Sequence, residues 1–164
     1  MSTTPVPDVE LDEIDRRIVA ALAEDGRLTN VELADRVGLS PSPCLRRVRR
    51  LEEAGVILGY RALVHPGVVG RGLTVFASLR MRFHDRELAE RLESMITGLE
   101  GVTEVHHLAG DADYLLRVEV ADLAEYDHFT RRVITQLPGI GHVTSHVVLD
   151  TMLDLDRGVG VRPA

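Results

Sequence analysis

The spacing of apolar residues changes part of the way along this chain, and no single structural element can accommodate both spacings. Between residues 11 and 55, apolar side chains recur every three or four positions, which places them on one face of a helix. The first such row consists of Leu11, Ile14, Ile18 and Leu22. Between residues 75 and 83, every second position is apolar, as in a strand with one buried face. A chain of 164 residues can hold two small domains, and this one is predicted to do so.

Three short helices are predicted in the first part of the chain. The second of them follows Thr29, which stands three residues before Glu32 as in a capping box, and it stops at Gly38. The short turn "GLS" leads to the third helix, which has Ser40 as its N-cap and ends at Gly55. Two helices joined by a short turn that contains glycine are typical of a helix-turn-helix. A short extended piece is expected at residues 56–60.

The second part of the chain is predicted to follow the order β-α-β-β-α-β of ferredoxin-like folds, which makes the protein α+β. After the first strand and helix, two strands flank the turn "GDAD". Asp122 and Glu125 form a possible capping box at the second helix, and "HVTSHVVLD" is the last strand. The predicted boundaries are a disordered tail at 1–10, a helix-turn-helix domain at 11–60, a linker at 61–72, a ferredoxin-like domain at 73–150 and a C-terminal tail at 151–164.

The third predicted helix carries four arginines in five positions, "RRVRR", although the net charge of the chain is −7. On a helical wheel, Cys44, Leu45, Val48 and Leu51 gather on one side, which should pack against the other two helices. The arginines spread over the solvent side and are not paired with acidic residues along the helix. Such a surface suits the DNA major groove, although a charged helix face is also often only solvated. The candidate DNA contacts are Ser40, Ser42, Pro43, Arg46, Arg47, Arg49 and Arg50.

The stretch "GLSPSPCLRRVRRLEEAGVI" and the helices before it resemble the winged helix-turn-helix of the Lrp/AsnC (feast/famine) family of transcription regulators. "LAGDADYLL" and "LPGI" resemble parts of the RAM/ACT-like regulatory domain of that family, so the resemblance covers residues 11 to about 150. It implies a sequence-specific regulator of promoter DNA. Its assembly or DNA affinity would respond to a small ligand, typically an amino acid, bound between regulatory domains. It also implies homodimers that assemble into tetramers or octamers.

The loop "AGDAD" corresponds to the effector loop of that family, although G-D-x-D is also an ordinary hairpin turn. Its glycine permits a close backbone approach, and Asp111 or Asp113 can accept hydrogen bonds from an α-ammonium group. The choice between the two aspartates stays open. The resemblance implies effector contacts by Leu108, Ala109, Gly110, Asp111, Ala112, Asp113, Tyr114, Leu123 and His146. Ala112 stands where members of the family often carry a larger residue, and His146 stands where a leucine-responsive member carries an aromatic phenol. Both departures argue against a branched-chain ligand.

The remaining chemistry-bearing residues do not predict a metal site or a cofactor. His106, His107, His142 and His146 fall on strands that could neighbour one another, but His106 and His107 should point to opposite faces. No ligand spacing accompanies them, and Cys44 has no second cysteine to join it.

The sequence also excludes several classes of protein. No apolar run is long enough to span a bilayer, and residues 1–10 lack the pattern of a secretory signal. We therefore expect a cytoplasmic protein with no membrane partner, and the resemblance to DNA-binding regulators implies that it is nucleoid-associated. A catalytic nucleophile, a paired acid and base and a phosphate loop are not recognisable, so no enzyme is expected. The alternatives are an architectural DNA-binding protein that ignores small molecules and an enzyme similar to haem-pathway decarboxylases.

Overall fold

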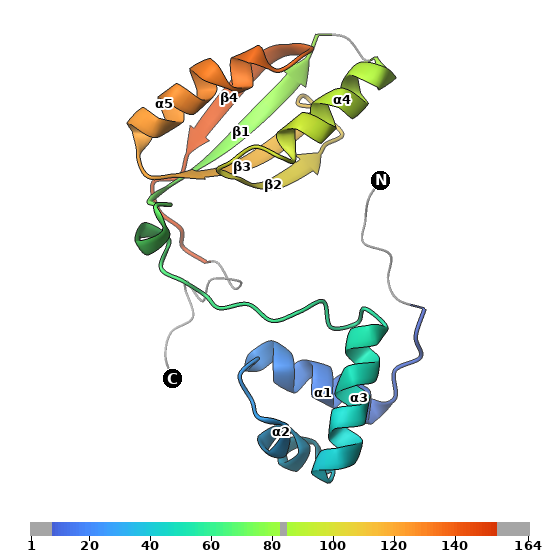
Figure 1. The fold of residues 1–164 in the computed structure, drawn as a ribbon. Coiled ribbons are helices and arrows are strands. Elements are labelled where there is room, and N and C mark those ends of the chain that lie inside the picture. Colours follow the sequence, from blue (N-terminus) through green and yellow to red (C-terminus); the bar gives the residue numbers. More distant parts are fainter. Residues whose placement is uncertain (1–7, 83–84, 154–164) are drawn as a thin grey trace. The chain divides into compact units, whose positions relative to one another are not determined.

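The computed structural model describes residues 8–82 and 85–153, so the tails predicted at 1–10 and 151–164 lie mostly outside the described residues. The chain divides after Ala62 into two compact units, and each is a body of its own. Figure 1 labels their elements in chain order. We call the first unit the head and the second the sheet unit. Among the described residues, no helix is both long and apolar enough to cross a bilayer.

The head consists of α1 (Glu13–Glu24), α2 (Asn30–Val37) and α3 (Pro41–Glu53), packed around a common core. The buried side chains of this core are Ile18, Ala21, Leu33, Ala34, Val37, Cys44 and Leu51. Residues 56–60 form no strand, and Val56 and Ile57 instead pack against this core. The helical periodicity of residues 11–55 therefore arises because one face of each helix contributes to a single core.

Capping groups define where the head helices begin and end. Thr29 and Glu32 form the predicted capping box, in which each side chain accepts a hydrogen bond from the other's backbone N–H. Asp12 and Asp15 form a second capping box at the start of α1. Ser40 is the N-cap of α3, although its side chain makes no capping hydrogen bond. Gly38 ends α2 with a φ of 73°, a left-handed conformation that side chains disfavour. The turn between α2 and α3 is thereby fixed at its α2 end, where the N–H of Gly38 also bonds to the carbonyls of Ala34 and Asp35.

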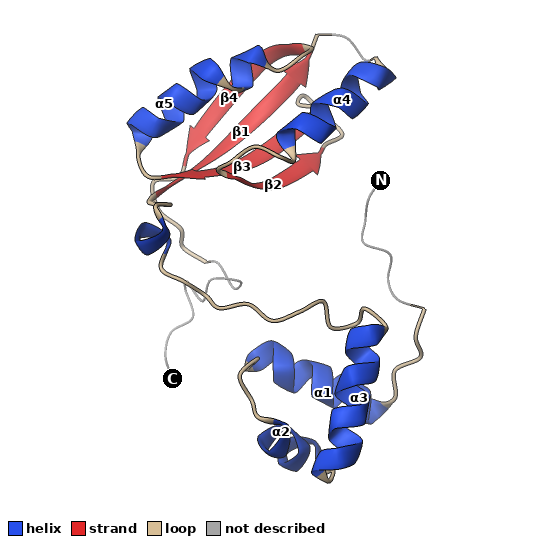
Figure 2. Cartoon of the chain, in the orientation of Figure 1, coloured by secondary structure: helices blue, strands red, loops and turns tan. Residues whose placement is uncertain are grey.

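The sheet unit has the predicted order β-α-β-β-α-β. Its elements are β1 (Leu73–Met81), α4 (Arg86–Ile96), β2 (Val102–His107), β3 (Tyr114–Val120), α5 (Leu123–Arg132) and β4 (Ile140–Val147). The strands lie in the order β2-β3-β1-β4, and every neighbouring pair is antiparallel. Both helices cover the same face of the sheet (Figure 2). The face opposite the two helices, which we call the open face, has no helix of the sheet unit over it in the described part of the chain.

Strand β1 shows how the alternating sequence separates the two faces. Val75, Ala77, Leu79 and Met81 are buried on the helix face, as predicted, while Phe83 lies outside the described residues. Phe76, Ser78 and Arg80 point to the open face. The helix face closes over one apolar core that also includes Leu92, Ile96, Leu116, Val118 and Phe129. The polar positions of β1 therefore face a surface that the sheet unit itself leaves uncovered.

The strand order corrects one prediction about the histidines. Strands β2 and β4 form opposite edges of the sheet, so His106 and His107 are not neighbours of His142 and His146. His106 and His107 do point to opposite faces, as expected. His107 stacks on Tyr114 with ring centroids 5.0 Å apart, whereas the Nε2 atom of His106 lies 3.2 Å from the carboxylate of Glu104. Among the described residues, no cluster of three or more His, Cys, Asp or Glu side chains could hold a metal ion.

The capping box predicted at α5 forms only in part. The Asp122 carboxylate accepts a hydrogen bond from the N–H of Glu125 at 2.9 Å, as expected for an N-cap. The Glu125 carboxylate, however, accepts from the N–H of Ala121 and not from that of the capping residue. The side chain reaches one residue further back, and it thereby ties the end of β3 to the start of α5.

Candidate functional site

The residues of α3 proposed to contact DNA lie along its first three turns. Ser40, Ser42, Arg46 and Arg49 are exposed, and Pro43 is half-buried. Arg46 and Arg49 make no hydrogen bond or ion pair with any other residue that the structure describes. The guanidinium groups of Arg46 and Arg49 thus present positive charge that no described residue compensates to an approaching polyanion. The N-terminus of the helix adds little to it, because Pro41 and Pro43 have no backbone N–H.

Arg47 and Arg50 are arranged differently, which corrects the expectation that the arginines are unpaired. Arg47 donates to the carboxylates of Asp12 at 2.6 Å and Asp15 at 2.8 Å, and Arg50 also donates to Asp15. Asp15 is completely buried, and 29% of the Arg47 side chain is exposed. The acidic partners lie on and before α1, more than thirty residues earlier in the chain. A helical wheel of α3 alone gives no signal for them.

The electrostatics of this cluster favour its charged form. A hydrogen bond from the backbone N–H of Asp15, followed by one from Arg47, lowers the pKa of Asp12. Hydrogen bonds to Asp12 and Asp15 raise the pKa of Arg47. Each shift stabilises the ionised partner, so the contact between α1 and α3 is held by charges that persist at neutral pH.

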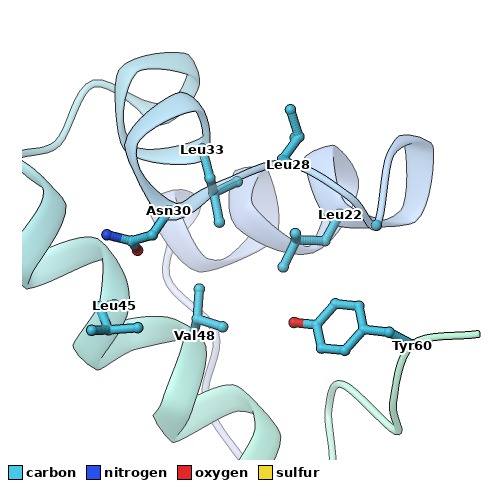
Figure 3. Close-up of a pocket in the computed structure, with 8 residues that line it drawn as sticks. Leu22, Leu28, Asn30, Leu33, Leu45, Val48 and Tyr60 are labelled. Carbon is cyan, nitrogen blue, oxygen red and sulfur yellow. The ribbon is translucent and has the colours of Figure 1, made fainter.

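A small pocket lies in the head between the three helices. It has a volume of about 150 Å³, and its apolar lining includes Leu22, Leu45 and Val48 (Figure 3). Leu45 lies on the side of α3 that faces the other two helices, as predicted, but it is 39% exposed and is not part of the core that contains Cys44. The side-chain oxygen of Asn30 is buried and has no hydrogen-bond partner among the described residues. This lining offers no charge to a polar ligand.

A second pocket, which we call the sheet pocket, lies against the open face and has a volume of about 300 Å³. Its lining residues are Ser78, Arg80, Asp111, Ala112, His142, Thr144 and His146. Ser78 is paired with Thr144 and Arg80 with His142 in neighbouring strands, so these side chains project together from one face. The side chains of Arg80, Asp111, His142 and His146 make no hydrogen bond or ion pair within the described structure. The sheet pocket therefore gathers charges of both signs that the sheet unit does not itself satisfy.

The two aspartates of the predicted effector loop occupy different environments. The Asp113 carboxylate accepts a hydrogen bond from the N–H of Met81 at 2.7 Å, and its backbone bonds to Leu79 and Leu108. Asp113 thus fastens the loop to β1. Asp111 is exposed and lines the sheet pocket. Of the two, Asp111 is the carboxylate that a ligand in the pocket would meet.

The structure brings together only some of the residues proposed to bind the effector. Asp111, Ala112 and His146 line the sheet pocket. The others do not line it: these are Leu108, Ala109, Gly110, Asp113, Tyr114 and Leu123. Tyr114 is buried on the helix face, where it donates a hydrogen bond to Glu93 of α4 at 2.9 Å. Leu123 is the first residue of α5 and is 60% exposed.

Sequence reasoning missed Ser78, Arg80 and Thr144 as pocket residues, and it considered His142 only as one of four histidines that do not predict a metal site. The signal for Ser78 and Arg80 was present, because they are the polar positions of an alternating strand. Their convergence with Thr144 and His142 depends on β4 lying beside β1, which the order of elements alone does not specify.

The β2 side of the open face satisfies its own charges. The Arg117 guanidinium lies 2.7 Å from Glu104 and 3.1 Å from Glu119, and Arg71 lies 3.8 Å from Glu119. Burial raises the pKa of Glu104, but hydrogen bonds from Arg117 and His106 outweigh it, and the net pKa is lowered. This network contrasts with the unpaired groups of the sheet pocket on the same face.

Two family models match this chain, one in the head and one in the sheet unit. Residues 11–57 match a family model described as winged helix-turn-helix DNA-binding, and residues 74–157 match the Lrp/AsnC ligand binding domain. The leucine-responsive regulatory protein of Escherichia coli K12 is 40% identical over 151 residues, which cover 92% of each chain.

Solved structures of regulators resemble this chain over most of its length. A transcriptional regulator of Neisseria meningitidis in complex with L-methionine has a TM-score of 0.83 and 36% identity, covering 88% of this chain and 94% of that one. An AsnC family regulator of Agrobacterium tumefaciens has a TM-score of 0.81 and 39% identity, covering 89% and 98%. The present chain is thus a DNA-binding transcriptional regulator with a ligand-binding regulatory domain, and not an enzyme. It belongs to the Lrp/AsnC family.

Proposed function

We propose that this regulator senses an amino acid that binds in the sheet pocket, and that binding changes its assembly or its affinity for promoter DNA. The observation that carries this proposal is the set of unpaired charges around a pocket of about 300 Å³. Pockets of this size suit small metabolites, and a few converging polar groups orient the ligand. The complex of the Neisseria relative with L-methionine supports an amino acid as the ligand class.

The lining suggests how a zwitterion is held. Asp111 accepts hydrogen bonds from the α-ammonium group, and Arg80 donates to the α-carboxylate, which its planar guanidinium can bind through two parallel hydrogen bonds. The ligand's side chain then meets Thr144, His142 and His146, which are hydrogen-bonding groups. A side chain with a carboxylate, carboxamide or hydroxyl group satisfies them, whereas a branched aliphatic one leaves them unpaired. We therefore place polar amino acids ahead of leucine, isoleucine and valine.

DNA binding in this proposal is performed by α3 in the major groove, with base and phosphate contacts from its exposed residues. Two copies pair through the open faces of their sheets, and such dimers assemble into tetramers or octamers in the cytoplasm on nucleoid DNA. The uncovered open face supports this assembly, since a sheet with helices on one side needs a second layer on the other. Joining several heads multiplies the affinity of each through effective concentration.

The test is a thermal-shift screen of the full-length protein against the twenty amino acids, followed by calorimetry on any hit. A ligand at a hundredfold excess over its Kd adds about 2.7 kcal/mol to the free energy of unfolding. Asp111→Asn should weaken a hit at least ~10-fold, because it removes a charge-assisted hydrogen bond worth about 1.5–3 kcal/mol.

Asp113→Asn is the matched control, because the asparagine oxygen can still accept the N–H of Met81. It should bind the ligand as the parent protein does, and both variants should bind DNA in the absence of ligand. Equal binding by parent and Asp111→Asn would contradict the pocket assignment. DNA binding without a response to any amino acid would favour the architectural alternative.

A further inference from the structure

The recognition helix α3 is joined to α1 by a buried carboxylate. Asp15 is completely buried and contacts the guanidinium groups of both Arg47 and Arg50, while Asp12 contacts Arg47 from the exposed side. Asp15 also accepts the backbone N–H of Asp12 as part of the capping box of α1. The Asp15 side chain thus caps the start of α1 and also holds the guanidinium groups of two of the four arginines of α3.

The burial of Asp15 makes this contact costly to open. A buried carboxylate that loses its cationic partner is left without compensation, and breaking such a pair is strongly unfavourable. Arg47 and Arg50 therefore remain paired with Asp15, although 51% of the Arg50 side chain is exposed, against 29% for Arg47. Arg46 and Arg49 have no such partner among the described residues and remain available.

This division matters because phosphate contacts are indifferent to sequence. Every arginine that reaches a phosphate adds to binding on any duplex and steepens its dependence on salt. Contacts to base edges, together with the shape of the DNA, distinguish one sequence from another. A helix with four mobile arginines would gain most of its affinity from phosphates, whereas a helix with two held arginines depends more on the groups that face the bases.

We propose that Asp15, assisted by Asp12, is a specificity-determining positioning residue: it holds Arg47 and Arg50 against α1 and leaves Arg46 and Arg49 as the arginines that contact DNA. Asp15 itself does not touch DNA. The proposal goes beyond the family's DNA-binding function, because it assigns different roles to neighbouring arginines and gives an acidic residue a role in recognition.

The first test compares two neighbouring arginines, in the full-length protein, on a duplex that the parent protein selects from a random library. Dissociation constants are measured by fluorescence anisotropy over a range of salt concentrations. Arg46→Gln should lower the slope of log K against log salt by about one, as expected for the loss of one phosphate contact, or should relax the selected sequence if the contact is to a base. Arg47→Gln should leave both the slope and the selected sequence unchanged. A loss of slope in Arg47→Gln equal to that in Arg46→Gln would overturn the proposal.

The second test releases the held arginines. Asp15→Asn keeps an oxygen for the capping box but removes the charge, so the slope should steepen by about one for each arginine that gains a phosphate. The ratio of affinities for the selected duplex and a scrambled one should fall about tenfold, the size of one lost base discrimination. A merely structural role predicts weaker binding to both duplexes with an unchanged ratio, and that result would refute the assignment.

Asp12→Asn is the matched control for this second test. Asparagine is a good N-cap, and Arg47 keeps its contact with Asp15, so the slope and the ratio should match those of the parent protein. A change in this control as large as that in Asp15→Asn would assign the role to surface charge in general and overturn the proposal. If Asp15→Asn does not fold, the comparison of Arg46→Gln with Arg47→Gln decides the question.

Discussion

Tyr114→Phe isolates one hydrogen bond in the core of the regulatory domain. The ring of Tyr114 is 2% exposed and stacks on His107, and its hydroxyl donates to Glu93 at 2.9 Å. Phenylalanine keeps the ring and the stacking, so the variant loses only the hydroxyl and its hydrogen bond. We expect the free energy of unfolding to fall by about 1 kcal/mol at neutral pH, because Glu93 is exposed and can bind water instead.

The size of this difference should depend on pH. Burial, together with the Glu93 carboxylate, raises the pKa of Tyr114 from 10.0 to about 12. The folded state therefore holds the phenolic proton more tightly than the unfolded state does. The stability that Tyr114 gains by keeping its proton is fully present below pH 10.0. It is lost as the pH rises through about 12, the pKa of Tyr114 in the folded state. Between these two pH values, the free energy of unfolding of the parent protein falls by about 1.4 kcal/mol per pH unit. The variant shows no such fall, because phenylalanine does not titrate.

The two effects together predict a crossover. The advantage of the parent protein, about 1 kcal/mol at neutral pH, should vanish near pH 11 and reverse above it. Urea unfolding followed by circular dichroism at both pH values measures the difference, since the chain has no tryptophan to report by fluorescence. The other titratable groups are shared by both proteins and cancel. A difference that stays constant with pH would refute the account of Tyr114.

Two further predictions concern a turn and a helix cap. Gly139 has a φ of 77°, and a Cβ atom there would lie 2.5 Å from the Cδ2 atom of Leu88, so Gly139→Ala should lower the free energy of unfolding by about 2 kcal/mol, measured by urea unfolding. Retained stability would show that the turn adapts. The pKa of Glu32 is lowered by hydrogen bonds from the Thr29 hydroxyl and backbone N–H. The stability that the Glu32 carboxylate contributes is present above pH 4.5, the ordinary pKa of a glutamate. It is lost as the pH falls through the lower pKa that Glu32 has in the folded state. Acid unfolding of Glu32→Gln, followed by helical circular dichroism, should therefore show a weaker pH dependence than that of the parent protein, and identical acid transitions would contradict this.

The elements of the fold were predictable because their signals are local. The three- and four-residue spacing from Leu11 onward identified α1, and the pair Thr29 and Glu32 identified the start of α2. Alternation along β1 assigned Val75 and Leu79 to the core. Each of these patterns lies within one element and depends on burial and backbone hydrogen bonds alone. The residue boundaries of the domains and the residues of the two candidate sites stay predictions.

The parts that the sequence did not predict depend on contacts between distant segments. The partners of Arg47 lie near the start of α1, and a helical wheel of α3 treats every outward position as solvent. Asp111 and Asp113 have the same chemistry and neighbouring positions, yet only Asp113 meets the N–H of Met81. The positions of His106 and His142 at opposite edges follow from strand order, which alternation along a strand does not encode.

The pairing of β1 with β4 has a consequence for how the protein is made. Val75 pairs with Val147 across the sheet, so β1 gains its neighbour on one side only after β4 has been synthesised. The contacts of α1, α2 and α3 all fall within the first third of the sequence, and local contacts of this kind form quickly. The DNA-binding head is therefore complete first during synthesis, and the ligand-sensing sheet is complete last. A chain released early, before Ile140, would contain all three helices of the head but would lack β4, the edge strand that completes the sheet.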